Sequence, residues 1–441
     1  MSFGGGSGSS SIAGSTDVVL NTPANNQVLG YNTSLAKWQN QTANSGGSSS
    51  YVSVKSYGAI GNGSTNDAAA INAAITAVQG ASVTSGITGG RLYFPPGEYL
   101  INSTINLNRF SGELVGAGVG NPPNYGASPG QGTVLRWAGA TGQPMFLMRD
   151  YAMVTISEMR LEGNNTNVPS YLIESRSTIG EGAGTEGQLR IEKCVLGTWP
   201  WSTQGVNVGT AAVAIGFTGY NGNNDQFHIS DSIIQGCPVG LDLPNSQSIW
   251  GNITDSMFGS CTTAGIRANA SFDANNIQFD DCAVDIKTYG SYGSARINIH
   301  GWYSERSLRL FDATTSLAAI NVFGGLWTLG GGGSMTGGIF LNHTNLTGGG
   351  QVNLDGLSIV NQLGAWPNIV GTGAGGGTTG LFRMVGCVHA GLTAADLNIT
   401  NAVGNTNGVN VIIDDAEIQT RQWLGSGTSL NAGLVTNHLP T

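Results

Sequence analysis

Charged residues are scarce in this sequence. Asp, Glu, Lys and Arg together make up 10% of the 441 residues, whereas an average globular chain has about 25%. The 26 acidic residues outnumber the 17 basic ones, which gives a net charge of −9. Such a surface does not suit the phosphates of nucleic acids, so we expect no nucleic-acid partner.

Long apolar runs and a basic N-terminus are missing as well. No stretch of about 18 apolar residues occurs, so we expect no membrane insertion. Residues 1–8 hold neither a basic start nor an apolar segment. We therefore expect no signal peptide and a chain that folds in a cytoplasm.

Cysteine and histidine are too few and too scattered to indicate a metal centre. The five cysteines form no Cys-x-x-Cys pair, and the five histidines show no ligand-like spacing. An odd number of widely spaced cysteines favours reduced thiols. No carboxylate cluster has a clear spacing for calcium ligands either. The sequence predicts no metal and no cofactor.

Glycine is the residue in excess. The chain has 70 Gly and only 13 Pro, which excludes a collagen or a Pro/Gly coil. Apolar residues reach 40%, enough for a large core, and this excludes disorder caused by low hydrophobicity. Together with many Asn, Ser and Thr, this composition favours an all-β chain rich in turns over a helical one.

Short apolar strands recur at a nearly constant spacing after about residue 150. Ile234, Phe258, Phe279, Tyr303 and Leu326 each end one such strand and follow one another at 24, 21, 24 and 23 residues. A repeat of this length, made of short strands and turns, indicates a parallel β-helix whose coils stack about 4.8 Å apart.

Three cysteines share one position in this repeat. Cys237, Cys261 and Cys282 each follow a strand end by three residues. Equivalent positions on successive coils form a column, so we expect a ladder of buried thiols.

Changes in composition divide the chain into five segments. We expect a flexible tip and attachment module at 1–42, a Gly/Ser linker at 43–50, a capping segment at 51–110, the β-helix coils at 111–425, and a C-terminal tail at 426–441.

The main domain opens on a recognisable pattern. Val52–Asp67, an Ala-rich helix to Val78, and then Gly89–Tyr99 closely resemble the opening of the pectate-lyase-like superfamily. The resemblance implies an all-β, right-handed parallel β-helix with an N-terminal capping α-helix. It leaves the activity open, because the superfamily contains lyases, hydrolases, epimerases and inactive binding proteins.

The N-terminal module carries a second resemblance. Asn26–Asn32 and Lys37–Asn40 are similar to short modules of bacteriophage tail fibres and minor tail proteins. A module, a linker and a β-helix in this order resemble a phage tailspike. The resemblance implies a homotrimer in the virion, assembled in the host cytoplasm. It also implies attachment to other tail or baseplate proteins through residues 1–42, and host surface polysaccharide as the ligand.

Two carboxylates are candidates for chemistry on that polysaccharide. Asp281 and Glu305 each follow a strand end by two residues, which would place them on adjacent coils. A carboxylate pair about 5 Å apart suits a retaining glycosidase, and a wider pair suits an inverting one. Alternatively, Glu305 pairs with Arg306 or caps a turn.

Asp255 is a third catalytic candidate. The segments Asn252–Asp255, Asp280–Cys282 and Ile299–Gly301 resemble polygalacturonase motifs in order and in spacing of one coil. Ile253 is an insertion relative to that pattern, and no Arg-Ile-Lys follows. The alternative for Asp255 is an Asx turn at a coil corner.

Substrate contacts are expected next to Glu305. Trp302, Tyr303 and Trp327 supply rings that could stack on sugars, and Arg306 could bind an acidic sugar. This assignment places the indoles outside the coil, although packing under a loop or between subunits remains an alternative. A slip of one residue near Asn276–His300 would turn these side chains to the other face.

Three functions therefore remain open. The first hypothesis is a tailspike-like protein that binds host glycan during attachment. The second is a polysaccharide depolymerase, either a hydrolase or a lyase. The third is a purely structural tail component.

Overall fold

The computed structural model describes most of the chain in separate ranges. These are 17–20, 27–32, 36–42, 51–80, 88–120, 132–177, 187–197, 211–219, 226–244, 250–289, 296–312, 319–329, 341–343, 351–361, 370–372, 381–390, 399–401 and 410–414. The contacts divide the chain into two compact units, Met1–Tyr51 and Val52–Thr441. The expected linker and C-terminal tail lie outside the described residues.

The first unit contains one small sheet. Strands β2 (Gln27–Asn32) and β3 (Lys37–Thr42) form an antiparallel hairpin, and β1 (Val18–Val19) adds to β3 in parallel. Tyr31 and Trp38 face each other across the hairpin with ring centroids 5.5 Å apart. Leu29, Tyr31 and Trp38 are all exposed in this small sheet.

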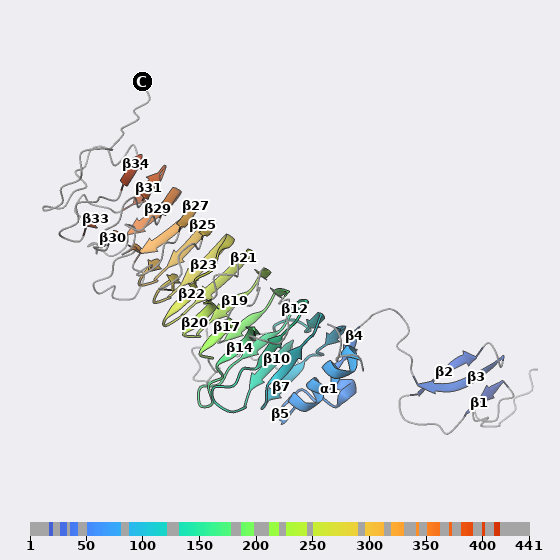
Figure 1. Cartoon of the computed structure of the whole chain (residues 1–441). Helices are drawn as coiled ribbons and strands as arrows, with labels where there is room; N and C mark the ends of the chain where they lie inside the picture. Colours follow the sequence, from blue (N-terminus) through green and yellow to red (C-terminus); the bar gives the residue numbers. More distant parts are fainter. Residues whose placement is uncertain are drawn as a thin grey trace, which may run out of the picture. The chain divides into compact units, whose positions relative to one another are not determined.

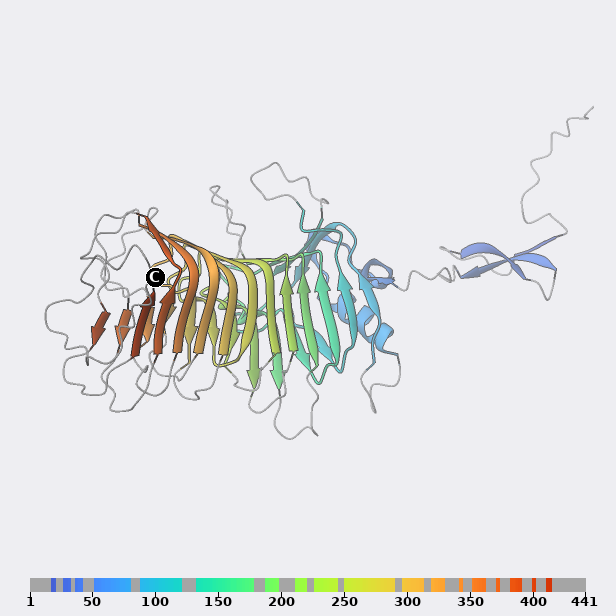
Figure 2. The ribbon, with the colours of Figure 1, turned by 90° about the horizontal axis from the view of Figure 1, so that it is seen from above.

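The second unit consists of coils that stack through parallel strand pairs (Figures 1 and 2). Successive coils pair in register and contribute to two sheets, of 20 and 11 strands among the described residues.

The larger sheet contains β4 (Tyr51–Ser53), β5 (Asn62–Asn66), β6 (Arg91–Tyr93), β7 (Gly97–Ile101), β9 (Gly112–Val115), β10 (Thr133–Trp137), β12 (Met153–Ser157), β13 (Arg160–Glu162), β15 (Gln188–Glu192), β16 (Val195–Gly197), β18 (Gln226–Ser230), β19 (Ile233–Gln235), β21 (Trp250–Gly259), β23 (Phe272–Asp280), β25 (Arg296–Glu305), β27 (Ala319–Leu329), β29 (Gln351–Asn361), β31 (Leu381–Val385), β32 (Val388–Ala390) and β34 (Asn410–Asp414). The smaller sheet contains β8 (Ile105–Asn108), β11 (Phe146–Arg149), β14 (Tyr171–Ser177), β17 (Val213–Gly219), β20 (Val239–Leu243), β22 (Ala264–Ala268), β24 (Ile286–Thr288), β26 (Phe311–Asp312), β28 (Leu341–His343), β30 (Val370–Thr372) and β33 (Ile399–Asn401).

The stacked parallel coils confirm the coarse expectation drawn from the repeat. The right-handed sense of the coil stays a prediction.

Among the described residues of this unit, one α-helix is present, and it lies near the start. A short 3-10 helix, η2 (Val54–Tyr57), precedes α1 (Ala68–Gln79), whose buried face contributes Ile71 and Ile75 to the core. The Asp67 carboxylate accepts hydrogen bonds from the backbone N–H groups of Ile60 (2.6 Å) and Gly61, which fixes the loop before the helix. A capping role for α1 stays a prediction. Within the described ranges, no helix is long and apolar enough to cross a membrane.

Residues with positive φ bend the long strands at one column. Asp255 in β21, Asn276 in β23 and Gly301 in β25 have φ values of 47°, 52° and 75°. Asn, Asp and Gly adopt this left-handed conformation at lower cost than other residues, so the sequence places each bend. Asp255 therefore sits at a corner, as its alternative interpretation proposed.

The bend at Gly301 corrects the expected register. Phe279 pairs with Ser304, and Ser304 pairs with Trp327, so the strand-end assignments of Tyr303 and Leu326 are wrong by one residue. The bend residue has to align with Asn276 on the coil below, and Gly301 meets this requirement. In the observed register Tyr303 and Leu326 point outward, with 43% and 37% of their surface exposed.

Aromatic rings stack through the interior of four coils. The ring centroids of Phe258 and Phe279 lie 5.6 Å apart, those of Phe279 and Trp302 5.8 Å, and those of Trp302 and Trp327 5.4 Å. Trp302 and Trp327 are buried, so the expectation that they face outward is wrong.

The predicted cysteine column is present. Cys237, Cys261 and Cys282 are buried free thiols, each directly after a bend residue. The next coil places Ser307 in this column, where its hydroxyl accepts a hydrogen bond from the Cys282 N–H at 3.2 Å.

Candidate functional site

A shallow groove of about 690 Å³ lies on the outer face of the larger sheet. Strands β18, β21, β23 and β25 form it. Its lining includes the side chains of His228, Trp250, Ser271, Asp273, Arg296 and Asn298. Outward residues alternate with core residues along each strand, so these side chains form columns across neighbouring coils.

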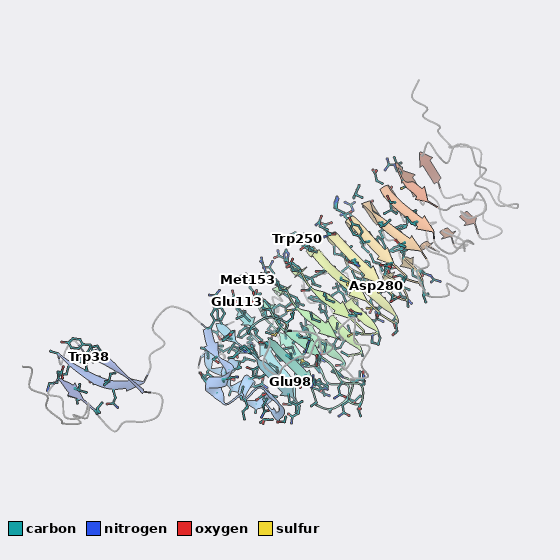
Figure 3. The ribbon with its side chains drawn as sticks, turned by 180° about the vertical axis from the view of Figure 1, so that it is seen from behind. Trp38, Glu98, Glu113, Met153, Trp250 and Asp280 are labelled. Atoms are coloured by element: carbon teal, nitrogen blue, oxygen red, sulfur yellow. The ribbon has the colours of Figure 1, made fainter. Side chains whose placement is uncertain are left out.

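Trp250 is the most exposed aromatic residue of the groove. It begins β21 and has 63% of its surface exposed. Its column continues through Gln226 and Gln188 to Met153, which is equally exposed. Figure 3 shows Met153 and Trp250 along the same edge of the coil stack. An outward indole beside polar side chains is a surface on which a sugar ring can stack.

A ladder of side-chain amides runs away from the groove. Asn298 Nδ2 donates to Asp273 Oδ1 at 2.7 Å, Asn321 Nδ2 to Asn298 Oδ1 at 2.7 Å, and Asn353 Nδ2 to Asn321 Oδ1 at 2.6 Å. The in-register coils put one amide on each coil of this column. The ladder fixes the rotamers of Asp273 and Asn298, and so gives the groove a preorganised polar floor.

His228 is the groove residue with a shifted pKa. Partial burial lowers the pKa of its imidazole, and the nearby positive charge of Arg190 lowers it further, against the opposing effect of Glu192. The ring is therefore neutral at neutral pH, and can both donate and accept a hydrogen bond.

Asp281 and Glu305 lie on adjacent coils, but not at equivalent positions, because the expected alignment was off by one residue. The Asp281 N–H donates to the Glu305 carbonyl at 3.0 Å, and in register Glu305 pairs with Asp280. Burial raises the pKa of Asp281, and Asp280 and Glu305 raise it further, while Arg306 opposes the shift. Glu305 and Asp281 are both exposed. In Figure 3, Asp280 lies on the other edge of the stack from Trp250.

Arg306 is occupied by these carboxylates. Its guanidinium donates to both oxygens of Asp280 at 2.6 and 2.8 Å, and lies 3.0 Å from Asp281 Oδ2. The pKa of Arg306 rises because of its hydrogen bond with Asp280. Arg306 therefore stabilises the acidic cluster, and its part in binding an acidic sugar stays a prediction.

Asp255 lies away from the other two catalytic candidates. Asn276 Nδ2 donates to its Oδ1 at 2.6 Å. Five residues of strand separate Asn276 from Asp281, which is about 16 Å at 3.3 Å per residue. Asp255 and Asp281 therefore lie at different bends of the coils, and the catalytic role of Asp255 stays a prediction.

The four expected substrate-binding side chains divide into two groups. Trp302 and Trp327 are buried, and the Trp302 indole donates to Asp285 Oδ2 at 3.2 Å in the core. Tyr303 is exposed and Arg306 partly so. The indoles are buried because the true register at Gly301 differs by one residue from the expected one, and a shift of one residue reverses the side-chain directions in β25.

Sequence reasoning missed the groove itself. One signal was the alternation of outward and core residues, which places Trp250 with polar side chains at 252 and 254, and polar side chains again at 296, 298 and 300. A small residue between two large ones, Ser271 between Trp250 and Arg296 on successive coils, was the second signal. Among the described residues, no group of three or more His, Cys, Asp or Glu could hold a metal ion.

The comparisons with known proteins agree with this fold. The profile of a family described as rhamnogalacturonase A/epimerase, pectate lyase-like matches residues 51–303, more than half of the chain. No curated protein matches the sequence.

The solved structures that the chain is similar to include enzymes and a phage protein. A DFA-IIIase from Arthrobacter chlorophenolicus A6 in complex with GF2 is 15% identical over 83% of this chain and 92% of its own, with a TM-score of 0.48. The mannuronan C-5 epimerase AlgE6 A-module of Azotobacter vinelandii is 15% identical over 81% and 97%, with a TM-score of 0.45.

The phiAB6 tailspike, in complex with oligosaccharides of Acinetobacter baumannii surface polysaccharide, is 16% identical over 63% of this chain and 46% of its own, with a TM-score of 0.39. These likenesses are too distant to indicate an activity. The profile match and the parallel coils together lead to one conclusion: the chain belongs to the rhamnogalacturonase A/epimerase, pectate-lyase-like family.

Proposed function

We propose that the protein is a phage tail component whose β-helix binds host surface polysaccharide in the groove at Trp250. The observation that carries the proposal is the 63% exposed indole at the edge of a groove of about 690 Å³. An exposed aromatic ring beside fixed polar groups in a groove is a combination that can stack on a sugar and hydrogen-bond its hydroxyl groups, and this supports the proposal.

The virion context rests on the N-terminal unit. Its hairpin, β2 and β3, forms a compact unit of its own, and its sequence resembles phage tail modules. We propose that this unit attaches the chain to other tail or baseplate proteins. We also propose a homotrimer, as in the tailspikes that the sequence resembles.

Replacing Trp250 tests the binding function. We expect Trp250→Ala to weaken retention on the recognised bacterial surface polysaccharide by roughly 30-fold, or about 2 kcal/mol, because the stacking surface is lost. The measurement is equilibrium binding to a panel of purified polysaccharides. Met153→Ala is the matched control, since Met153 has the same exposure and lies in the same column. Equal affinities of wild type and Trp250→Ala would rule out this groove.

A depolymerase is the second candidate function, and the acidic cluster favours it. Asp281 has a raised pKa and adjoins Glu305 on the next coil, and an acid–base pair needs carboxylates in different protonation states. This site lies outside the groove at Trp250, so binding and cleavage would use different parts of the surface.

The test of cleavage is release of oligosaccharide from the polysaccharide that the protein binds. We expect Glu305→Gln to slow the release at least 100-fold, because the general acid–base group is lost. Asp231→Asn, a change at an exposed carboxylate of another coil, should leave the rate unchanged. If the wild-type protein releases nothing while it still binds, the depolymerase proposal fails and the binding proposal stands.

A further inference from the structure

Arg296 is the arginine of the groove, and it differs from most arginines that the structure describes in the coils. Nine arginines form ion pairs with carboxylates, namely Arg91, Arg136, Arg160, Arg176, Arg190, Arg267, Arg306, Arg309 and Arg383. Arg296 is exposed at the groove, and within the described ranges no carboxylate lies at ion-pair distance from its guanidinium.

The neighbouring acid of the groove is directed elsewhere. Asp273 lies one coil below, and its Oδ1 accepts the amide of Asn298, the start of the ladder through Asn321 and Asn353. The backbone N–H of Arg296 is bound by the Ser271 hydroxyl at 3.0 Å, which fixes where its side chain begins. A planar guanidinium in this position presents hydrogen-bond donors to the groove, with no acceptor from the described protein.

We infer that the groove recognises a glycan that carries an anionic group, and that Arg296 binds that group. This inference rests on the proposed binding function and names its ligand class. A guanidinium fork matches both a carboxylate and a phosphate oxygen pair, so a uronic acid and a phosphate-substituted sugar share the required chemistry.

The spacing of the groove adds a second requirement. Trp250, Ser271 and Arg296 follow one another in one column, so Trp250 and Arg296 lie two coils apart, about 10 Å. This span is longer than a single sugar ring. We therefore expect the stacked sugar and the anionic group to belong to neighbouring residues of one glycan, with the small Ser271 leaving room between them.

The experiment uses an array of bacterial oligosaccharides in matched pairs. Each uronic acid glycan is paired with its carboxyl-reduced form, and each phosphate-bearing glycan with its dephosphorylated form. We expect the full-length wild-type protein to bind at least one anionic member about tenfold more tightly than its neutral partner. Whether the carboxylate or the phosphate pair shows this preference identifies the source of the charge.

Variants separate the inference from the proposed function. Arg296→Gln should abolish the preference, Arg296→Lys should retain part of it, and Arg91→Gln, a change at a remote exposed arginine, should keep it. Equal binding of both members of every pair, with binding lost in Trp250→Ala, would overturn the inference and leave glycan binding intact. An equal loss of preference in Arg91→Gln would also overturn it, because a general charge effect would then explain the result. No binding to any glycan would overturn both.

Discussion

The variant Asp285→Asn is expected to be more stable than the wild type at pH 8, by up to about 4 kcal/mol in the free energy of unfolding. Asp285 is fully buried, and burial raises its pKa to about 7. The Trp302 indole and the hydroxyls of Ser304 and Ser307 oppose this shift. Asn keeps the shape and an acceptor for the Trp302 N–H, but carries no charge.

The pH dependence follows from the raised pKa of Asp285. Below about pH 4 the carboxyl is protonated in both the folded and the unfolded chain, and its contribution is constant. Between about pH 4 and pH 7 the unfolded chain releases this proton more readily than the folded one, so stability falls as the pH rises. Above pH 7 the loss is complete. Each tenfold difference in the acid dissociation constant between the two states corresponds to about 1.4 kcal/mol.

Urea unfolding at pH 4 and at pH 8 measures this effect. The difference between Asp285→Asn and the wild type should grow between the two pH values. Asp231→Asn is the control, because Asp231 is exposed at a bend where Asn also tolerates a positive φ. A gain that is the same at both pH values would mean that packing and not ionisation explains it.

The variant Glu162→Gln is expected to lose roughly 3 kcal/mol of stability. The Glu162 side chain is fully buried, and its two oxygens lie 2.8 Å from Arg136 Nε and 2.8 Å from Arg160 Nε. Arg160 is itself almost completely buried. Gln removes the negative charge between two guanidinium groups, and an unbalanced buried charge costs far more than a broken surface pair.

An exposed ion pair on the same sheet gives the comparison. Arg91 and Glu113 lie 2.9 Å apart, with 43% and 34% of their side chains exposed. Glu113→Gln should therefore change the free energy of unfolding by less than about 1 kcal/mol. If urea unfolding gives the same small loss for both variants, the charge at Glu162 is balanced by solvent and the burial argument is wrong.

The repeat was predictable because it depends on spacing alone. A period of about 23 residues and three equally placed cysteines specify stacked coils without any knowledge of contacts. The same argument placed Asp281 and Glu305 on adjacent coils, although the register pairs Glu305 with Asp280 and not with Asp281. These are features in which one residue per coil determines the result.

The direction of side chains near Gly301 was not predictable from spacing. Apolar matching favoured Tyr303 as the strand end, whereas the structure aligns the residues that can adopt positive φ. A backbone requirement at the bend therefore outweighed hydrophobic matching. This one-residue difference moved Trp302 and Trp327 from the expected binding surface into the core.

The groove was missed because no single segment contains it. Trp250, Ser271 and Arg296 come from three coils and combine only through register. To predict the groove, one would have to compare the side-chain sizes along a column and find a small residue between two large ones.

The regular coils also affect how such a chain can evolve. Bends at Asp255, Asn276 and Gly301 hold these coils in register. Each coil offers its neighbours nearly the same backbone, so the duplication or loss of one whole coil preserves every pairing on either side of it. Evolution can therefore lengthen or shorten the stack of coils in steps of about 4.8 Å, so that its length can be selected without disturbing the remaining coils. An insertion of any other length within a strand would instead reverse or break a column.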